Sequence, residues 1–479
     1  MNDDVLDSPT AFLTAGAGIP ESARATLAGL EADWNERWMQ VSTTVDRMGG
    51  ARLHQHDRFG RRCDRLEWPA GYREMRVGGY AAGAVAAMQE TGSLLPGYRL
   101  GYVTSFFDPG LYCPYTVSLG TAIALRKYGG VEMQPWLERL CRRDDTVWQG
   151  ATWMTEVAGG SDLGANVVTA AAPGDDRWLL SGDKYFASNA DAELAVVAAR
   201  PEGAPAGIRG LALFAVPRWR EDGGLNFHIR RLKDKVGTRS VATGEIELDN
   251  AEGWLLGDPE QGIYAIMEVL NASRVANSIG SVALIQRALA EVRAFASRRV
   301  VFGRALIEQP LFRRQFEDWQ RDLHAASALA WAAASELDAV WQETPPYSAR
   351  FHRFRLLAHL AKYWTADRAV AAARWAIEAH GGNGLLADYG IERLLREALV
   401  LSVWEGTPHR QMLDGLEVMV RMEAHEALFE WLGYPQGTQA RREEIEALIA
   451  RSEDERAAGV EPLFERLATW TAEALAGQA

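Results

Sequence analysis

The chain has 479 residues, a length that predicts two or three domains rather than one core. Its hydrophobic fraction of 48% is that of a soluble globular protein, and its net charge of −13 argues against a general nucleic-acid or anionic-membrane binder. Three cysteines without metal-ligand spacing, no HExxH motif and no apolar run of transmembrane length predict a cytoplasmic protein with no metal site.

The pattern of apolar residues divides the chain into regions. Residues 1–150 are expected to form an N-terminal helical domain, because Ala- and Leu-rich runs such as Thr116–Tyr128 recur there. Residues 151–258 carry short apolar runs between Gly, Asp and Pro turns, for example Leu194–Ala199. This alternation of short strands and turns predicts an antiparallel β domain.

Helical periodicity returns after the β region. Residues 259–422 contain several long runs with apolar residues near a 3.6-residue period, which predicts a C-terminal helical bundle. Residues 423–479 are predicted to form an acidic helical tail, since the stretch from Arg421 onward has six arginines against twelve acidic residues. We expect this tail to pack on the bundle as a solvated helix pair rather than to recognise a partner.

Glu405 is the main candidate for catalysis. It lies between a helical pattern that ends near Val403 and a second one that begins with Thr407 as N-cap and Pro408 at the first helical position. A carboxylate at such a junction can be shielded from water, and desolvation raises the pKa of a carboxyl group toward the range of a general base. A glutamate that simply favours a helix start is the competing interpretation, and the junction alone favours it.

Two stretches of the β region are suited to a cofactor. Met154–Asp162 combines glycines, which allow close approach of the main chain, with hydroxyls that can bond a phosphate or a ring carbonyl. Lys184–Asn189 places an aromatic ring and a hydroxyl two residues apart on one strand face. A Gly-rich turn and ordinary sheet packing remain the alternatives. No strand–GxGxxG–helix unit is present, so the first stretch is not a Rossmann fingerprint.

Two helix ends carry groups that can bind an anion. Arg298–Arg304 closes a long helix with cations, a position that the helix dipole favours in any case. His380–Gly384 closes another helix with a flexible loop, which suits either a glycine C-cap or main chain beside a pyrophosphate. The capping interpretation is favoured for both.

The order and spacing of these motifs resemble the acyl-CoA dehydrogenase superfamily over about residues 52–420. Within it the chain resembles most the AidB-like branch of adaptive-response flavoproteins. That resemblance implies an α+β fold with an N-terminal all-α domain, a middle antiparallel β-sandwich or barrel, a C-terminal four-helix bundle and a short acidic helical tail. The residues that carry the resemblance to the branch include Arg58–Arg62, Leu111–Pro114, Met154-Thr155-Glu156, Leu232–Ser240, Gly253–Gly257 and Trp404-Glu405-Gly406.

The resemblance implies an FAD site. Thr155 would lie near the flavin ring and Ser161 at the pyrophosphate, while Phe186 and Ser188 would flank the isoalloxazine near N5. Ser188 stands where the family usually has Thr. The residues that the resemblance assigns to this part of the site are Met154, Thr155, Gly160, Ser161, Phe186 and Ser188.

The resemblance also implies that subunits share their cofactors. Arg299 and Gln309 would reach the FAD of a neighbouring subunit, beside the main chain of Gly381 and Gly382. A homodimer or homotetramer is therefore expected. Thr407 would contact the flavin end of the pocket, and His409, where the family often has Gln, would add charge near the pyrophosphate; these two residues complete the assigned set.

The implied chemistry is α,β-dehydrogenation of an acyl thioester, with EC class 1.3 expected. Glu405 matches the family's base, which removes the α-proton while the β-hydride moves to flavin N5, and Arg274 is assigned to substrate binding. In one subgroup the base instead lies immediately before the arginine that matches Arg274. Ser273 holds that position here and is no base at neutral pH, so Glu405 is the motif-matched base.

Two other functions stay open. A flavin monooxygenase or oxidase of the same fold, acting on a non-thioester substrate, would have little need for Glu405. A DNA-protective flavoprotein like AidB would need a basic C-terminal extension, and the acidic tail argues against nucleic-acid binding. The expected partner is an acyl thioester of CoA or a carrier protein, and the electron acceptor is unknown.

Overall fold

The computed structural model describes residues 3–15, 18–174 and 176–478, so the outer limits of the first and last predicted domains lie outside the described residues. The chain forms two compact units. We name Pro20–Ser273 the continuous unit, and Met1–Ile19 together with Arg274–Ala479 the discontinuous unit. Helix α10 (Gly262–Arg298) begins in the continuous unit and ends in the discontinuous unit.

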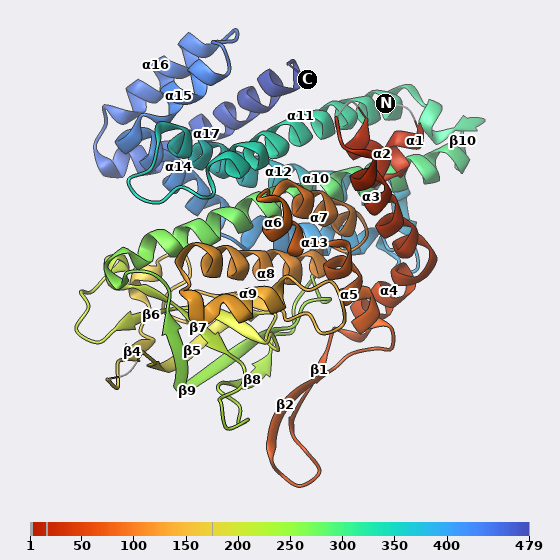
Figure 1. The fold of residues 1–479 in the computed structure, drawn as a ribbon. Helices are drawn as coiled ribbons and strands as arrows, with labels where there is room; N and C mark the ends of the chain where they lie inside the picture. The colour runs from red at the N-terminus through yellow and green to blue at the C-terminus, as the bar shows by residue number, and fades with distance from the viewer. Residues whose placement is uncertain (1–2, 16–17, 175, 479) are drawn as a thin grey trace. The chain divides into compact units, whose positions relative to one another are not determined.

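The first part of the continuous unit is mainly helical. A β-hairpin of β1 (Arg52–His56) and β2 (Arg62–Glu67) interrupts it, and the sequence pattern did not predict this hairpin (Figure 1). Charged and polar side chains fill most positions of both strands, which leaves no clear alternation of apolar residues. The helices are α3 (Glu21–Asp33), α4 (Met39–Met48), α5 (Tyr72–Ala82), α6 (Ala86–Thr91), α7 (Leu95–Phe107), α8 (Pro109–Tyr128) and α9 (Gln134–Leu140).

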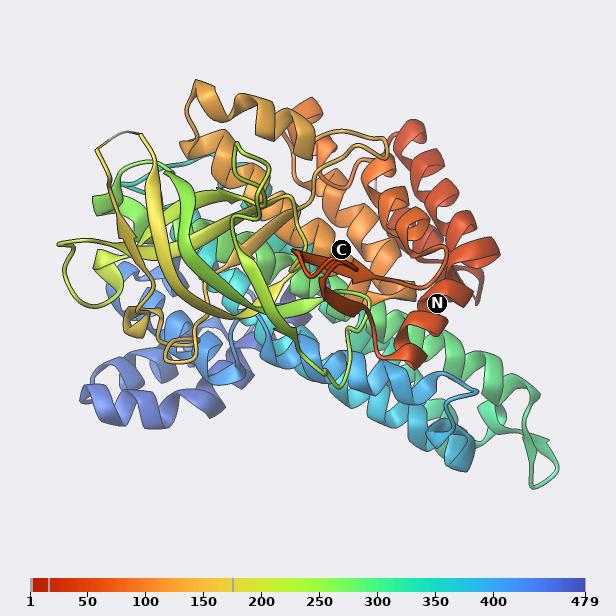
Figure 2. The same cartoon turned by 90° about the horizontal axis from the view of Figure 1, so that it is seen from below.

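The second part of the continuous unit is a seven-stranded sheet. Neighbours pair in the order β3-β6-β4-β5-β9-β7, β8 joins β9, and β6 also pairs with β7, so the pairings close into a barrel-like sheet. The strands lie side by side in Figures 1 and 2. They are β3 (Gly150–Trp153), β4 (Thr169–Ala171), β5 (Trp178–Ser188), β6 (Leu194–Pro201), β7 (Ala212–Pro217), β8 (His228–Leu232) and β9 (Thr243–Leu255).

The predicted antiparallel β domain needs one correction. Most pairs are antiparallel, but β3 and β4 both run parallel to β6. Strands β6 and β7 are buried along almost their whole length, because nearly every residue of both is small or apolar. The core of the sheet includes Trp153, Phe214 and Phe227.

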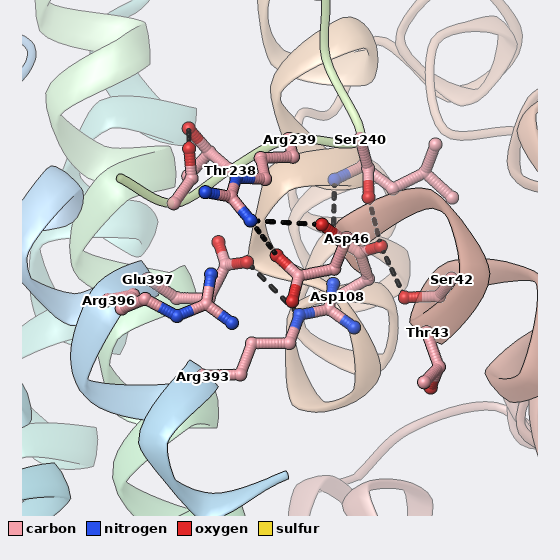
Figure 3. Close-up of polar contacts among 12 residues, drawn as sticks. Ser42, Thr43, Asp46, Asp108, Thr238, Arg239, Ser240, Arg393, Arg396 and Glu397 are labelled. Atoms are coloured by element: carbon pink, nitrogen blue, oxygen red, sulfur yellow. Dashed lines mark hydrogen bonds and ion pairs between the residues drawn. The ribbon is translucent and has the colours of Figure 1, made fainter. Parts of the chain in front are cut away.

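A buried carboxylate joins the helical part and the sheet part of the continuous unit. Asp108 accepts hydrogen bonds from the hydroxyls of Ser42 and Ser240, as Figure 3 shows. Its other oxygen accepts from the main-chain N–H of Leu111 at 3.0 Å and so caps helix α8. Helices α4 and α8 are thereby tied to the loop that precedes β9.

The discontinuous unit is helical, as predicted. The short hairpin of β10 (Val300–Val301) and β11 (Arg304–Ala305) projects beyond the end of α10 in both views (Figures 1 and 2). Besides α10, the helices are α1 (Asp3–Asp7), α2 (Pro9–Thr14), α11 (Pro310–Val340), α12 (Ala349–His380), α13 (Ile391–Val403), α14 (Pro408–Met422), α15 (Ala424–Trp431), α16 (Thr438–Ile449) and α17 (Glu453–Ala476).

The acidic tail forms helices that pack on the bundle. Phe464 of α17 is fully buried and lies against Gly415 of α14, where a Cβ atom would come within 2.4 Å of its ring. Its ring also makes an edge contact with Tyr363 of α12. The indole of Trp364 donates to Thr469 at 3.0 Å. These contacts agree with a packing role for the tail.

The N-terminal segment of the discontinuous unit packs against helix α10, whose Gln286 follows Leu6 by 280 residues in the chain. Leu6 is 1% exposed, and Gln286 of α10 donates from its amide to the carbonyl of Leu6 at 2.9 Å. Arg293 of α10 forms an ion pair with Asp7. In the described part of the chain, no helix is long and apolar enough to cross a membrane.

Candidate active site

Glu405 occupies a tight turn between α13 and α14. Its φ of 59° lies in the left-handed region, which is uncommon for a residue with a side chain, and Gly406 follows with a φ of 102°. Thr407 then caps α14 by accepting from the N–H of Arg410, and Pro408 opens the helix. The predicted helix junction and N-cap are therefore confirmed.

Three side chains hold the main chain of this turn. Gln411 donates from Nε2 to the carbonyl oxygens of Glu405 and Gly406 at 3.0 and 3.1 Å. Lys362 of α12 donates to Gly406 O at 2.7 Å, and Arg274 of α10 lies 3.4 Å from Glu405 O. Strained backbone persists only where its surroundings fix it, and these donors provide that restraint.

A buried histidine sets the orientation of Gln411. His359 of α12 lies with Nδ1 2.9 Å from Gln411 Oε1. Burial lowers the pKa of His359 to about 3, and the charge of Arg274 adds to this effect, so the ring is neutral at pH 7. Since the Gln411 amide nitrogen already donates to carbonyls, its oxygen accepts and Nδ1 of His359 carries the proton.

An ion-pair network next to the Glu405 turn joins α10 and α14. Asp414 of α14 accepts from Arg274 at 3.2 Å and from Arg410 at 2.7 Å. Burial alone would raise the pKa of Asp414, but the charges of Arg274 and Arg410 lower it below its ordinary value. Burial lowers the pKa of Arg274, and the negative charges of Asp414 and Glu405 oppose this shift. The contacts of Arg274 are thus directed to the Glu405 turn and α14.

In the continuous unit, the loop Met154–Ser161 is fixed to strand β5. Glu156 is 3% exposed and accepts from Lys184 Nζ at 2.6 Å and from the N–H of Val167, also at 2.6 Å. Burial lowers the pKa of Lys184 to about 8, and Glu156 opposes this shift. The Tyr185 N–H donates to the carbonyl of Thr155 at 3.0 Å. A buried, hydrogen-bonded ion pair therefore anchors the predicted cofactor loop.

The predicted aromatic and hydroxyl groups lie on β5 next to this anchor. Phe186 is 55% exposed, and Lys233 lies 5.0 Å from the centre of its ring. Ser188 is half-buried, lies 3.3 Å from the hydroxyl of Thr243, and accepts through its carbonyl from the indole of Trp153. The loop and the strand end thus present an exposed ring and a hydroxyl together.

Other predicted residues lie at the end of α10 and α12, away from the Glu405 turn in the same unit. Arg299 follows α10, and its carbonyl accepts from the N–H of Leu306, while Gln309 is the N-cap of α11 and donates to the carbonyl of Val301 at 2.8 Å. A surface depression of about 550 Å³ adjoins Gln309. It is lined by Arg304, Glu308, Pro310, Arg313, Arg314 and Glu317.

Gly381 is the C-cap of α12, as the capping interpretation predicted. It has a φ of 60°, and its N–H donates to Glu378 O. Gly382 follows, and a Cβ atom at either glycine would meet nothing within 4 Å. His409 is exposed at the second position of α14.

The predicted residues thus form three groups. The loop and β5 residues lie together in the continuous unit; Arg274, Glu405 and Thr407 lie together in the discontinuous unit; and Arg299 with Gln309 lies at the β10–β11 hairpin. Sequence reasoning missed Lys362, His359 and Gln411, and it gave Glu156 and Lys184 no structural role. Lys362 and His359 are three residues apart on α12, but only the fold shows which face of that helix meets the Glu405 turn.

The chain matches three family models in chain order. They are described as adaptive response protein AidB N-terminal domain over residues 2–145, acyl-CoA dehydrogenase middle domain over residues 151–251, and acyl-CoA dehydrogenase C-terminal domain over residues 260–419.

Two relatives illustrate the similarity. Acyl-CoA dehydrogenase family member 11 of Caenorhabditis elegans is 30% identical over 440 residues, which are 87% of this chain and 71% of that protein. AidB of Escherichia coli is 32% identical over 330 residues, which are 65% of this chain and 58% of AidB.

Two solved structures have a fold similar to that of this chain. The structure titled Bd2924 apo-form has a TM-score of 0.87 at 26% identity and covers 100% of this chain and 97% of that one. Caenorhabditis elegans ACDH-11 in complex with C11-CoA has a TM-score of 0.83 at 25% identity, over 100% of this chain and 87% of that one.

The chain therefore belongs to the acyl-CoA dehydrogenase family, and its N-terminal region is of the AidB type. The α+β fold predicted from the sequence, helical at both ends with a β region between, is confirmed. Membership of this family supports an oxidoreductase that uses FAD.

The residues present fit that cofactor. In the described part of the chain, the main-chain N–H groups of Gly160 and Ser161 have no hydrogen-bond acceptor within the protein, and both residues are exposed. A Cβ atom at Gly160 would meet only the methyl group of Thr155, at 3.5 Å, so the loop leaves room for close approach. Exposed N–H donors suit a pyrophosphate, and the exposed ring of Phe186 suits a flat aromatic ligand.

Proposed function

We propose that the protein is an FAD-dependent acyl-CoA dehydrogenase in which Glu405 is the base that removes the α-proton of an acyl thioester. The observation that carries this proposal is the restrained turn around Glu405. A general base works well only when its position relative to the reacting bond is fixed, and Arg274, Gln411 and Lys362 hold this turn.

The loop and β5 residues are proposed to hold the flavin. Met154, Thr155, Gly160 and Ser161 would lie along it, and Phe186 with Ser188 would flank its ring; Thr407 and His409 would contribute from α14. When bound, FAD supplies the hydride acceptor that no amino-acid side chain can provide. The Glu156–Lys184 ion pair supports this assignment, because it gives the loop a fixed position against the strand.

Arg274 is better suited to positioning Glu405 than to contacting substrate. Arg274 is 3% exposed, and its guanidinium pairs with Asp414 and lies near the carbonyl of Glu405. These contacts favour a role in holding the turn, and the earlier assignment to substrate binding becomes the alternative.

Subunits are proposed to share their cofactor sites. Arg299 and Gln309 lie at a hairpin that projects from the helices, with the exposed ring of Phe302 at its tip. This position supports contact with the FAD of a neighbouring subunit, beside Gly381 and Gly382. A homodimer or homotetramer follows from this proposal.

An acyl-CoA is the first substrate to test. The similarity to ACDH-11, whose structure holds C11-CoA, favours a CoA thioester of similar chain length over a carrier-bound one. The experiment that tests this is an anaerobic titration of the purified protein. Straight and branched acyl-CoAs of about 4 to 16 carbons are added in turn, and the absorbance of the oxidised flavin is followed.

Bleaching by one chain length would establish dehydrogenation and name the substrate class. A protein that holds oxidised flavin but is bleached by none of the panel would contradict the proposal for CoA thioesters. The same panel carried on an acyl carrier protein then separates a tethered substrate from a monooxygenase or oxidase.

A further inference from the structure

Lys362 is a buried cation in the middle of helix α12. Its side chain is 1% exposed, and a buried ammonium is stable only where acceptors replace the water it has lost. The acceptors here are main-chain carbonyls: Nζ donates to Ser402 O at 2.9 Å and to Gly406 O at 2.7 Å. The group therefore binds two points of the main chain.

These two points lie on either side of Glu405. Ser402 belongs to the last turn of α13, where carbonyl groups lack partners within the helix, and Gly406 directly follows Glu405 in the turn. One ammonium thus links the end of α13 to the residue after Glu405. The dipole of α13 also favours a positive charge at this end of the helix.

The contacts of Gln411 and Arg274 do not replace this link. Both donate to carbonyls within the turn, whereas Lys362 alone among these three side chains also binds the end of α13. Asn277 of α10 also binds the end of α13, by donating to Leu401 O at 3.0 Å, but Lys362 holds the end of α13 and the turn through one group.

The charges of Lys362 and Glu405 act on each other. Burial lowers the pKa of Lys362 to about 7, the negative charge of Glu405 opposes that shift, and Arg274 adds to it. Below pH 7 the ammonium is present and stabilises the ionised carboxylate. The other titratable or charged groups around this turn in the same unit are Arg274 from α10, Arg355 and His359 from α12, and Arg410 and Asp414 from α14.

We propose that Lys362 is a positioning residue for Glu405, because it fixes the turn that carries the carboxylate. This inference rests on the proposed role of Glu405 as the base. Lys362 is buried and its ammonium donates to the main chain on both sides of Glu405, so its effect passes through Glu405.

The test is the variant Lys362→Met, which keeps the length of the side chain and removes its charge and its donors. With the acyl-CoA that bleaches the wild-type flavin, we expect unchanged FAD content and half-saturation within about threefold. The rate of bleaching should fall about 10- to 100-fold, since small displacements of a reacting group have effects of this size. The acid limb of its pH profile should move up by about 0.5 to 1 pH unit.

A matched control is Lys235→Met in the continuous unit. Lys235 also binds two main-chain carbonyls, Thr238 O at 2.6 Å and Val241 O at 2.8 Å, next to a residue with positive φ, but its loop does not carry Glu405. We expect it to change the rate less than about twofold and to leave the acid limb in place. Equal effects of both variants would reduce Lys362 to a general structural role and overturn the proposal.

Hydrogen exchange gives a readout that needs no substrate. In Lys362→Met, amides of residues 402–410 should exchange at least about tenfold faster while the sheet is unchanged; in Lys235→Met only residues 233–242 should respond. Unchanged exchange at 402–410 together with an unchanged rate would overturn the proposal. If Lys362→Met does not fold, Lys362→Gln, which keeps an N–H donor without the charge, should still move the acid limb.

The variant Glu405→Gln separates this inference from the proposed function. If wild type is bleached and Glu405→Gln is not, the base is established, and a normal Lys362→Met rejects the role of Lys362 alone. If Glu405→Gln is bleached as fast as wild type, the proposed function of Glu405 fails, and the positioning inference fails with it.

Discussion

At the scale of single residues, each unit contains a buried lysine that holds predicted site residues in place. Burial lowers the pKa of both lysines: Glu156 opposes the shift at Lys184, whereas at Lys362 Glu405 opposes the shift and Arg274 adds to it. The two lysines differ in their hydrogen-bond acceptors, which are a carboxylate for Lys184 and the carbonyls of Ser402 and Gly406 for Lys362. The Lys184 pair anchors a loop, and Lys362 supports a turn.

Replacing the base should stop the reaction without removing the flavin. In Glu405→Gln the side chain keeps its size but cannot accept a proton, so the rate of flavin bleaching should fall about 10²- to 10⁴-fold or more. The visible spectrum of the purified variant and its FAD content should match wild type. Undiminished bleaching by the same acyl-CoA would remove Glu405 from the mechanism.

The Glu156–Lys184 pair should respond asymmetrically to substitution. Glu156→Gln leaves the buried ammonium of Lys184 without its partner, so we expect a loss of about 3–5 kcal/mol in the free energy of unfolding and lower FAD content. Lys184→Met leaves Glu156 with the N–H groups of Val167 and Val168, and the loss should be about 1–3 kcal/mol. Urea unfolding of both variants measures the difference; a larger loss for Lys184→Met would contradict it.

Lys362 should make stability depend on pH above neutrality. Its folded pKa of about 7 is below the unfolded value of about 10.4, so between these values only the unfolded chain binds the proton. Stability therefore rises with pH from about 7 to 10, by up to about 1.4 kcal/mol per pH unit from this group. Unfolding free energies of wild type and Lys362→Met at pH 7, 8 and 9 should diverge in favour of wild type; parallel curves would be inconsistent with the shift.

At the scale of elements, local patterns predict much of the structure. The long helices from α10 to α14 follow from their apolar periodicity, and the Glu405 junction follows from the N-cap signal of Thr407 and Pro408. The hairpin β1–β2 was missed because its strands are polar. The parallel pairing of β3 with β6 was missed because strand order depends on the whole sheet.

The restraints on the Glu405 turn could not be predicted in the same way. Lys362 and His359 come from another helix, about 40 to 50 residues earlier, and a lysine in the middle of a helix usually faces solvent. Gln411 is closer, but only the positive φ of Glu405 directs the carbonyls of the turn toward it. Such contacts depend on how helices pack, which periodicity alone does not give.

Helix α17 should contribute strongly to the stability of the discontinuous unit. Phe464 is fully buried against Gly415 and Tyr363, so Phe464→Ala should lower the free energy of unfolding by about 3–5 kcal/mol. Phe59→Ala removes the same side chain from a position that is 67% exposed and should change it by less than about 0.5 kcal/mol. Thermal unfolding of the two variants measures this difference. If Phe464→Ala leaves the free energy of unfolding nearly unchanged, the tail does not pack on the bundle as described.

At the scale of the whole molecule, the first 19 residues belong to the unit that the end of the chain builds. Removing them would expose the surface that Leu6 and Leu13 cover and would leave the amide of Gln286 without the carbonyl of Leu6. We expect the deletion to destabilise the discontinuous unit by about 3–6 kcal/mol, from the burial of two leucines.

Hydrogen exchange locates the effect of that deletion. Amides of residues 280–295, in the second half of α10, should exchange faster, while those of strands β5 to β7 in the continuous unit should not. Uniform acceleration throughout the chain would mean that the segment stabilises both units alike. Leu6→Ala, expected to lower stability by about 2–4 kcal/mol, is the milder variant for comparison.

This arrangement has a consequence for synthesis of the protein. The ribosome releases the N-terminal segment first, and the helices that receive it only after the continuous unit, roughly 250 residues later. At about 5–20 residues per second, Leu6 and Leu13 wait on the order of ten to fifty seconds for their partners. Over that time the nascent chain carries the apolar side chains of Leu6 and Leu13 without the helices that bury them, so chaperones can bind them, and all strands of the barrel-like sheet leave the ribosome before most of these helices do.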